Sequence, residues 1–409
     1  MEHRISRRTL LAGSAGLGLF PRSSTPDPAG PANCPEPAPA VEPLRAEHGL
    51  IALRRDLHRH PEGPGQERRT AAVVAGRLRA AGLDVTTGVG GHGVVGVLAG
   101  ARPGRTVAYR ADMDAVPPGD QIGGGPEPAH LCGHDLHTTI GVGVAEALAR
   151  RRRTLGGSVV FVFQPAEETL TGAAAMLADG LFAHTRPAEI HALHCAPIPT
   201  GRIMVTPGVG LPGRDAGTVT LDSPEAATRL AERLTALSTV ARPETPEQLE
   251  RLWEDLATAG GPLAEFVVVQ ASVRPDNPAT VRINARCWPE QRYTRVREEI
   301  RRLAAPATVD FPTDPFPAMV CPPAEALELR RHLGSAEVAH AAIPFSGEDF
   351  ALFLKEMPGT YSFLGVRGPK ASITSSYPHF GTFAPDERAI GHGVRAMTGW
   401  LASRAVSRG

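Results

Sequence analysis

The sequence predicts an α/β fold in which a mixed sheet is flanked by helices, with a smaller α+β domain inserted into it. Two observations support this prediction. Short apolar runs that indicate strands alternate with helical segments, and this alternation is interrupted and later resumes. The interruption begins at about residue 217, and the first pattern returns at about residue 324. A chain of 409 residues is long enough for two domains, each with its own core.

Residues 1–20 resemble a twin-arginine export signal. Ser6-Arg7-Arg8-Thr9-Leu10-Leu11 precedes an apolar, small-residue run that ends at Phe20 and is too short to span a bilayer. Residues 21–44 are rich in Pro, Ala and Ser, which predicts a flexible linker. A mitochondrial-type presequence is the alternative, but Glu2 and the weak amphipathicity argue against it. We therefore expect an exported protein whose mature form has no membrane partner.

The larger domain is expected to span residues 45–214 and 306–409. Leu50, Leu53 and Leu57 recur at helical spacing, and Ser158–Phe163 is the clearest buried strand. The other apolar runs are bounded by Gly and Pro, as strands commonly are. These patterns predict helices within about 46–82, 135–149 and 172–181, and strands at 94–98, 106–110, 158–163 and 189–193.

The insert, expected at residues 215–305, has its own order of elements. The sequence predicts a strand at 218–221, a helix at 225–240, strands at 266–273 and 280–286, and a helix at 295–303. This order is typical of a compact ferredoxin-like domain, which we expect to act as a lid. No internal repeat is found, which argues against a solenoid.

The bulk composition excludes several classes of function. The 43 basic and 43 acidic residues cancel, so no net field favours nucleic acid or an anionic membrane. Five cysteines without a tight repeated spacing do not form a disulfide framework. In an oxidising compartment, a Cys132–Cys195 bridge is an alternative for the pair nearest the candidate chemistry.

A short segment carries most of the candidate chemistry. His130–His137 contains three histidines, a cysteine and an aspartate, and Gln164-Pro-Ala-Glu-Glu168 follows at the end of an apolar run. Imidazole, thiolate and carboxylate suit a divalent ion such as zinc or manganese. Two adjacent carboxylates offer one ligand and one general base. Taken singly, His137 is better read as a helix-face or hydrogen-bonding histidine, and Asp135 as a residue that interacts with the helix dipole.

Polar residues also follow three predicted strands at the point where each ends. Asp112 and Asp114 follow one strand, Glu167 and Glu168 follow another, and His194 closes a third. Ligand sites in open α/β sheets lie outside such strand ends. Side chains from separate strands are therefore expected to converge on one crevice.

Several motifs occur in a fixed order along the chain. They are Arg54-Arg-Asp-Leu-His-Arg-His-Pro-Glu62 with Glu67 and Thr70, Arg110-Ala-Asp-Met-Asp114, Cys132-Gly-His134-Asp135, Gln164-Pro-Ala-Glu-Glu168, Leu193-His194, Gly347-Glu-Asp-Phe350, His379 and Asp386-Glu387. With them the chain resembles the metallopeptidase superfamily of aminoacylases and glutamate carboxypeptidases. The similarity is to its amidohydrolase branch, which includes hippurate hydrolase and auxin-conjugate hydrolases. The motifs span about residues 50–215 and 340–395 and are jointly specific.

The resemblance implies a role for each matching residue. It implies a centre of two divalent ions, zinc or manganese, with the ligands Cys132, His134, Glu168, His194 and His379. It also implies that Glu167 is the general base and that Asp112 orients the ligands. Such a base takes a proton from the attacking water and returns it to the leaving amine.

The insert departs from the pattern of the family. Related enzymes carry a Gly-Gly-His-type motif there, whose histidine stabilises the tetrahedral intermediate, in many cases across a dimer. Here no histidine lies between His194 and His332. Loss of such a group typically lowers the rate by about 10² or more. Asn277 and Arg286 are weaker candidates for binding a substrate carboxylate, and a homodimer is the expected assembly if the usual arrangement holds.

We therefore expect an exported metal-dependent amidohydrolase that cleaves N-acyl amino acids or similar small amides. One alternative is a catalytically impaired relative that keeps the metal site and binds a ligand, because the insert lacks the histidine of the family. The other is a disulfide-stabilised protein without metal.

Overall fold

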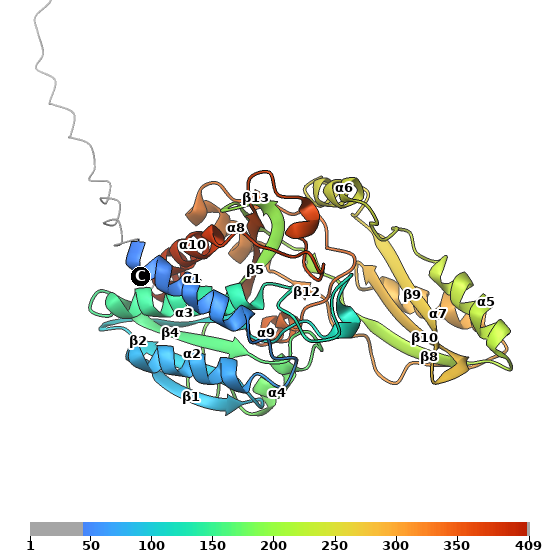
Figure 1. Ribbon diagram of the computed structural model, residues 1–409, viewed down its shortest axis with the longest axis horizontal. Helices are drawn as coiled ribbons and strands as arrows, with labels where there is room; N and C mark the ends of the chain where they lie inside the picture. The colour runs from blue at the N-terminus through green and yellow to red at the C-terminus, as the bar shows by residue number, and fades with distance from the viewer. Residues whose placement is uncertain (1–43, 407–409) are drawn as a thin grey trace, which may run out of the picture. The chain divides into compact units, whose positions relative to one another are not determined.

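The computed structural model describes residues 44–406, so the predicted signal and nearly all of the predicted linker lie outside the described residues. An eight-stranded mixed sheet is the centre of the larger part of the chain (Figure 1). Its strands are β1 (Asp84–Val89), β2 (Gly93–Ala99), β3 (Arg102–Asp112), β4 (Gly156–Gln164), β5 (Ile190–Pro199), β6 (Ile203–Val205), β13 (Glu337–Val338) and β14 (Gly359–Arg367). They lie in the order β1-β2-β4-β3-β5-β14-β6-β13.

The central strands β4, β3, β5 and β14 run parallel, so their carboxyl ends meet at one edge of the sheet. Alternate residues of β4 face opposite sides of the sheet, as the pleat requires. Phe161 and Phe163 belong to one buried cluster, whereas Val160 and Val162 belong to another. Both faces of this strand are therefore buried, which is why it reads as an uninterrupted apolar run.

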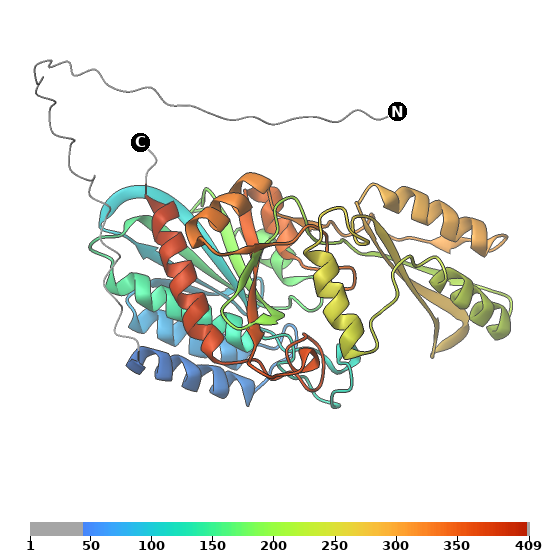
Figure 2. The same cartoon turned by 90° about the horizontal axis from the view of Figure 1, so that it is seen from above.

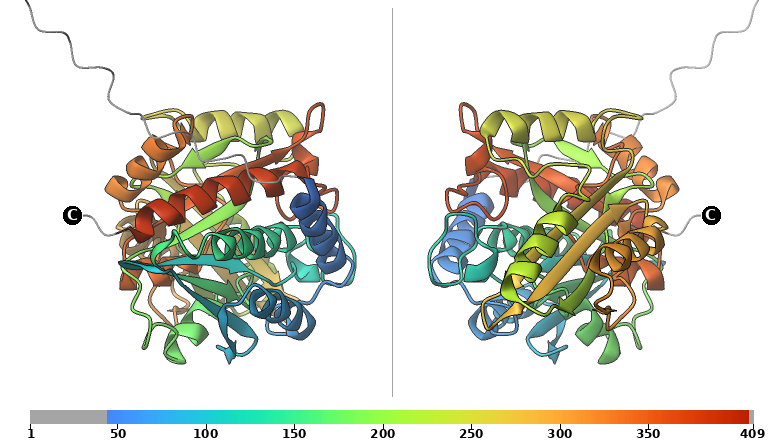
Figure 3. Two further views of the ribbon diagram at one scale, coloured as in Figure 1. Left: turned by 90° about the vertical axis from the view of Figure 1, so that its left-hand side faces the viewer. Right: turned by 90° about the vertical axis from the view of Figure 1, so that its right-hand side faces the viewer.

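Helices cover both faces of the sheet. One face is covered by α1 (Leu44–His58), α2 (Arg68–Ala80), α3 (His134–Arg150) and α10 (Arg388–Ala405), which stand in front of the sheet in the left view of Figure 3. On the other face lie α4 (Gly172–Ala178) and α9 (Phe350–Glu356), while α8 (Pro323–Leu333) contacts β6, β14 and α10. The small residues of α3 allow this close packing, because a Cβ at Gly143 would lie 2.7 Å from both Leu50 and Val394.

A second, antiparallel sheet forms the insert (Figure 2). Its elements are β8 (Asp215–Thr220), α5 (Pro224–Thr235), β9 (Phe266–Arg274), β10 (Asn277–Trp288), α7 (Arg292–Ala304) and β11 (Val309–Asp310). The strand order β11-β8-β10-β9 is that of a ferredoxin-like sheet. Because β11 pairs with β8, the sheet extends beyond the limit of 305 predicted for this domain. Helix α5 ends at Thr235, earlier than the predicted end at 240.

Helix α6 (Pro246–Leu256) was not predicted from the sequence. It starts at a capping box in which Thr245 and Gln248 satisfy each other's backbone N–H groups. The apolar face of α6 packs into the core of the larger domain. There the rings of Trp253 and Phe363 lie 6.1 Å apart between centroids. The segment between α5 and β9 therefore connects the insert to the larger domain, because the apolar side chains of α6 are buried in the core of that domain.

The remaining elements are short. They are β7 (Gly210–Leu211), β12 (Met319–Val320), η1 (Pro118–Asp120) and η2 (Ile373–Ser375). Within residues 44–406, no helix is both long and apolar enough to cross a bilayer.

Candidate metal centre and substrate pocket

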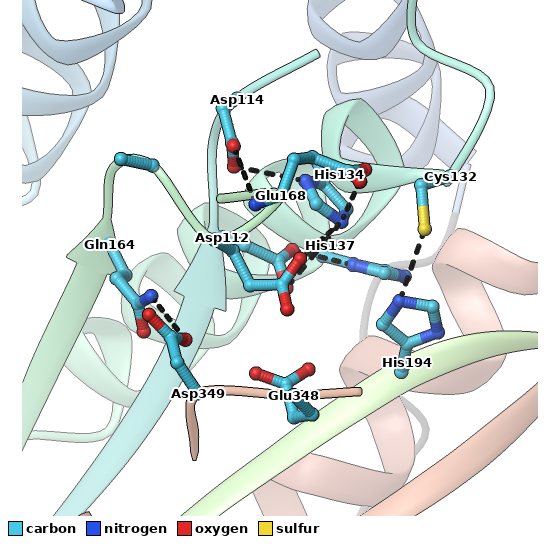
Figure 4. Close-up of polar contacts among 12 residues, drawn as sticks. Asp112, Asp114, Cys132, His134, His137, Gln164, Glu168, His194, Glu348 and Asp349 are labelled. Atoms are coloured by element: carbon cyan, nitrogen blue, oxygen red, sulfur yellow. Dashed lines mark hydrogen bonds and ion pairs between the residues drawn. The ribbon is translucent and has the colours of Figure 1, made fainter. Parts of the chain in front are cut away.

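The five ligands implied by the resemblance meet at the carboxyl edge of the large sheet. Four of them, Cys132, His134, Glu168 and His194, are labelled in Figure 4. His134 begins α3, His194 lies on β5, and Glu168 follows β4. Cys132 precedes α3, and His379 arrives from a loop near the C-terminus. Residues far apart in the sequence are thus brought together by the parallel order of the strands.

The donor atoms of these five side chains lie within a few ångströms of one another. His134 Nε2 is 3.7 Å from Glu168 Oε1, and the other oxygen of Glu168 is 3.4 Å from His379 Nε2. Cys132 Sγ is 3.5 Å from His194 Nε2, and the donors of Cys132, His134 and Glu168 all lie within 4.8 Å of one another. These separations leave room for ions coordinated by several of the side chains at once.

The chemistry of the cluster fits divalent cations. His134 Nε2 and Glu168 Oε1 are buried and have no hydrogen-bond partner among the described residues. Burial would lower the pKa of His134, but the carboxylates of Asp112 and Asp114 outweigh it and raise the pKa to about 10. Burial and Glu168 raise the pKa of the Cys132 thiol well above its usual range. A site that holds this much negative charge is stabilised by bound cations, which also favour the thiolate.

Asp114 contacts two of the candidate ligands. One carboxylate oxygen of Asp114 lies 3.2 Å from His134 Nδ1, and the other accepts a hydrogen bond from the Glu168 backbone N–H at 2.9 Å. The Nδ1 contact leaves Nε2 of His134 directed at the cluster. The sequence placed Asp114 at a strand end but did not indicate this role.

His137 lies beside the cluster and forms hydrogen bonds through both ring nitrogens. Its Nε2 accepts a hydrogen bond from the Cys195 backbone N–H at 2.8 Å, so its Nδ1 donates to Asp112 at 2.7 Å. Both ring nitrogens are therefore used. Asp112 lies at the centre, with its second oxygen 3.8 Å from His134 Nε2, as expected for a residue that orients ligands.

The weaker candidate Asp135 does not reach the cluster. Its carboxylate lies 2.8 Å from His58 Nδ1 and 2.9 Å from Arg54 Nε. It therefore ties the first turn of α3 to α1. Cys132 and Cys195 are free thiols, so the alternative disulfide is not formed in this structure.

Two site residues have a left-handed backbone that non-glycine residues rarely adopt. Ala166, directly before the two glutamates, has φ of 52°, and His379 has φ of 70°. Glu67 holds the first by accepting a hydrogen bond from the Ala166 N–H at 2.9 Å. Two contacts hold His379 in this conformation. Its backbone N–H donates a hydrogen bond to the Leu131 carbonyl at 2.7 Å, and its ring Nδ1 lies 3.0 Å from the Asp120 carbonyl oxygen.

Glu167 is buried beside the cluster of candidate ligands. Its Oε2 is 3.9 Å from His134 Nε2, and its carboxylate also groups with those of Glu348 and Asp349. Burial, followed by the charge of Glu348, raises the pKa of Glu167 well above its usual range. A raised pKa suits a group that must take up a proton near neutral pH.

A buried arginine neutralises part of this acidic region. Arg110 contacts Asp112 at 2.5 Å, Glu348 at 3.0 Å and Asp349 at 3.4 Å. Gln164 accepts from Arg110 Nε at 2.9 Å and donates to Asp349 at 2.7 Å. The network connects the ends of β3 and β4 to the segment before α9, and so fixes the carboxylates of Glu348 and Asp349 that lie beside Glu167.

Replacing Arg110 with Met is expected to lower the free energy of unfolding by roughly 3–5 kcal/mol, because buried carboxylates lose their counter-charge. Urea unfolding at neutral pH measures the change. The matched control is Arg105→Met on the same strand, where Glu189 keeps its second partner Arg404 at 2.6 Å. We expect a loss of about 1 kcal/mol or less for this control. Equal losses for the two variants would contradict the role given to Arg110.

The cluster opens into a pocket of about 710 Å³. One wall is apolar and includes Leu249, Trp253 and Phe363. The lining also includes Asn284 and Arg286 of the insert, which are two residues apart on β10 and therefore face the same side of the strand. The pocket contains no histidine from the insert, because none occurs there.

The two weaker candidates for carboxylate binding differ in position. Arg286 lines the pocket, and its guanidinium donates to the carbonyls of Pro212 and Gly213 at 3.4 and 3.2 Å. Asn277 instead begins β10 at the hairpin, where its side chain accepts from the Ala279 N–H at 3.3 Å. It does not line the pocket.

The chain is similar to known proteins in both sequence and fold. A family model described as peptidase family M20/M25/M40 matches residues 108–403. N-acetyldiaminopimelate deacetylase of Enterococcus faecalis is 28% identical over 381 residues, which cover 87% of this chain and 97% of that protein. Thermostable carboxypeptidase 1 of Saccharolobus solfataricus is 30% identical over 393 residues, which cover 86% and 94%.

Among solved structures, the YXEP protein of Bacillus subtilis is described as a dinuclear metal-binding peptidase from the M20 family. It matches with a TM-score of 0.65 at 26% identity, over 88% of this chain and 98% of that chain. The mixed α/β fold and the resemblance predicted from the sequence are confirmed by these comparisons.

Proposed function

Because this chain belongs to peptidase family M20/M25/M40 and is a metal-dependent hydrolase that acts on amides, we propose that its substrates are N-acyl amino acids. The observation that carries the proposal is the position of Glu167, which lines the pocket and whose Oε2 is 3.9 Å from Nε2 of the proposed ligand His134. A carboxylate there lies next to the atoms that would react.

Cys132, His134, Glu168, His194 and His379 are the residues that would hold two divalent ions, zinc or manganese. When bound, such ions lower the pKa of a water molecule and polarise the carbonyl of the scissile amide. Asp112 and Asp114 keep the imidazoles oriented through their hydrogen bonds to His137 and His134.

Glu167 then acts as the proton carrier. It accepts the proton of the attacking water and delivers it to the nitrogen of the leaving amino acid. Its high pKa, caused by burial and by Glu348, favours the protonated state that the second transfer requires. The Arg110 network holds the carboxylates of Glu348 and Asp349 in place beside Glu167.

Different residues of the pocket lining suit the two parts of the substrate. Arg286 and Asn284 offer a guanidinium and an amide to the carboxylate of the amino acid, and an arginine is well suited to bidentate carboxylate binding. Leu249, Trp253 and Phe363 offer an apolar surface to the acyl group.

A hydrolysis screen tests this function. Purified protein is assayed with N-acetyl, N-benzoyl and indoleacetyl amino acids, with Mn²⁺ or Zn²⁺ added, and the released amine is measured. Release from at least one series is expected. Bound metal without release from any substrate would contradict the function and favour the impaired relative, whose support is the absence of an insert histidine.

We further propose that the protein is exported through residues 1–20, since Arg7 and Arg8 precede an apolar run. Replacing both arginines with Lys is expected to retain the full-length protein in the cytoplasm of a bacterial host, as shown by fractionation and immunoblotting. Arg4→Lys, outside the pair, is the control and is expected to be exported normally. Equal export of the two variants would exclude this route.

A further inference from the structure

Three arginines line the pocket without a carboxylate partner. Within residues 44–406, no ion pair is formed by Arg214, Arg242 or Arg286. The buried arginines elsewhere behave differently: Arg110 contacts Asp112 at 2.5 Å, and Arg404 contacts Glu189 at 2.6 Å. A cation partly removed from water is costly unless an anion compensates it, so the half-buried Arg214 and Arg286 are open to an anionic ligand.

The guanidinium of Arg286 is held beside the backbone that leads into Arg214. Arg286 Nη1 donates to the carbonyls of Pro212 and Gly213, the two residues directly before Arg214. Arg214 is itself anchored, because its backbone exchanges hydrogen bonds of 3.1 and 2.8 Å with Phe316. Burial, and to a lesser extent the nearby charge of Arg214, lower the pKa of Arg286 to about 10.

The space around Arg286 is fitted to its guanidinium. A Cβ at Gly347 would lie 2.5 Å from Arg286 Nη1, so the absence of a side chain at Gly347 makes room for the cation. Asn284 Oδ1, on the same face of β10, is buried and has no hydrogen-bond partner among the described residues. The pocket lining therefore offers two cationic side chains, with the amide nitrogen of Asn284 as a further donor, which is more than one carboxylate requires.

We propose that the pocket selects N-acyl derivatives of acidic amino acids, with the α-carboxylate bound at Arg286 and the side-chain carboxylate bound at Arg214. This inference rests on the proposed function and specifies its substrate. Two guanidinium groups that line the same pocket match two carboxylates carried by one small amino acid. Arg242 is exposed at the pocket and adds positive potential that attracts a dianionic substrate.

The first test compares kcat/KM for N-acetylglutamate with that for N-acetylglutamine, which differ only by the charge of the side chain. We expect a preference of about 10- to 100-fold for the acidic substrate, as for hydrogen bonds to charged groups. A second pair places the extra charge on the acyl side: N-succinylalanine and its terminal amide. Discrimination within this pair but not within the first would overturn the assignment of Arg214 to the amino acid.

The second test uses Arg214→Gln. The preference for N-acetylglutamate over N-acetylglutamine is expected to fall at least tenfold, because one charged partner is removed. Arg282→Gln is the matched control, since Arg282 is exposed on β10, the strand that carries Arg286, and does not line the pocket. An unchanged ratio in Arg214→Gln, or an equal loss in both variants, would overturn the inference.

Binding separates failure of this inference from failure of the proposed function. Calorimetric titration of the metal-loaded Glu167→Gln protein with the same two acetylated amino acids does not depend on turnover. Tighter binding of N-acetylglutamate supports the inference even if no substrate is cleaved. Hydrolysis of N-acyl amino acids without preference in rate or binding would overturn the inference and leave the proposed function in place.

Discussion

Replacing Glu167 with Gln is expected to lower kcat by about 10³-fold or more while both metal ions stay bound, since general acid–base groups contribute up to about 10⁴. Gln has nearly the same shape as Glu but cannot carry a proton between water and the leaving amine. Glu167 Oε2 lies 3.9 Å from His134 Nε2, so the substitution is adjacent to the cluster and removes none of its five proposed ligands. Steady-state kinetics with an N-acyl amino acid, together with metal analysis, measures both effects.

The neighbouring Glu168 is the matched control. Glu168→Gln makes the same chemical change one position along the chain, but it alters a side chain whose oxygens face His134 and His379 at 3.7 and 3.4 Å. This variant is expected to lose metal, and its activity is expected to recover in part at high metal concentration. If Glu167→Gln kept its rate, or lost metal as Glu168→Gln does, the two carboxylates would have been assigned the wrong way round.

The second large effect is expected from His134. Its Nε2 is buried without a hydrogen-bond partner among the described residues and lies in the middle of the donor atoms. Replacing His134 with Asn is expected to weaken metal binding by more than the 10- to 100-fold loss typical of residues that only orient a ligand. Dialysis against graded chelator followed by elemental analysis gives the affinity.

His191 is an equally buried histidine that serves as the control. It lies on β5, where its Nδ1 meets Thr360 Oγ1 at 2.9 Å and its ring contacts Trp400. His191→Asn is expected to change stability but to keep the metal affinity of the parent protein. If both variants lost metal to a similar extent, the loss would be caused by unfolding, and the result would contradict the assignment of His134 as a ligand.

The alternation of strands and helices was sufficient to predict the fold, because buried parallel strands such as β4 read as apolar runs. The sequence did not predict α6, although Thr245 and Gln248 form a capping box that was available as a signal. That α6 packs on the larger domain depends on contacts such as Trp253 with Phe363, which no local pattern specifies.

The candidate site shows a similar division. Cys132, His134 and Glu168 were named from motifs at strand ends, and the parallel sheet brings them together. The supporting network was not foreseen, because Arg110 and Glu348 are separated by 238 positions in the sequence. Asn284 lines the pocket two residues before Arg286. Because side chains two residues apart on a strand face the same side, Arg286 could have led to Asn284 as the second candidate for carboxylate binding in place of Asn277.

The central claim is that five side chains from distant parts of the chain share two divalent ions. The most direct measurement is anomalous diffraction from crystals of the metal-loaded protein, recorded on both sides of the metal absorption edge. The account predicts two anomalous peaks among Cys132, His134, Glu168, His194 and His379, next to Glu167. An absence of peaks there, or peaks bound by other residues, would contradict it.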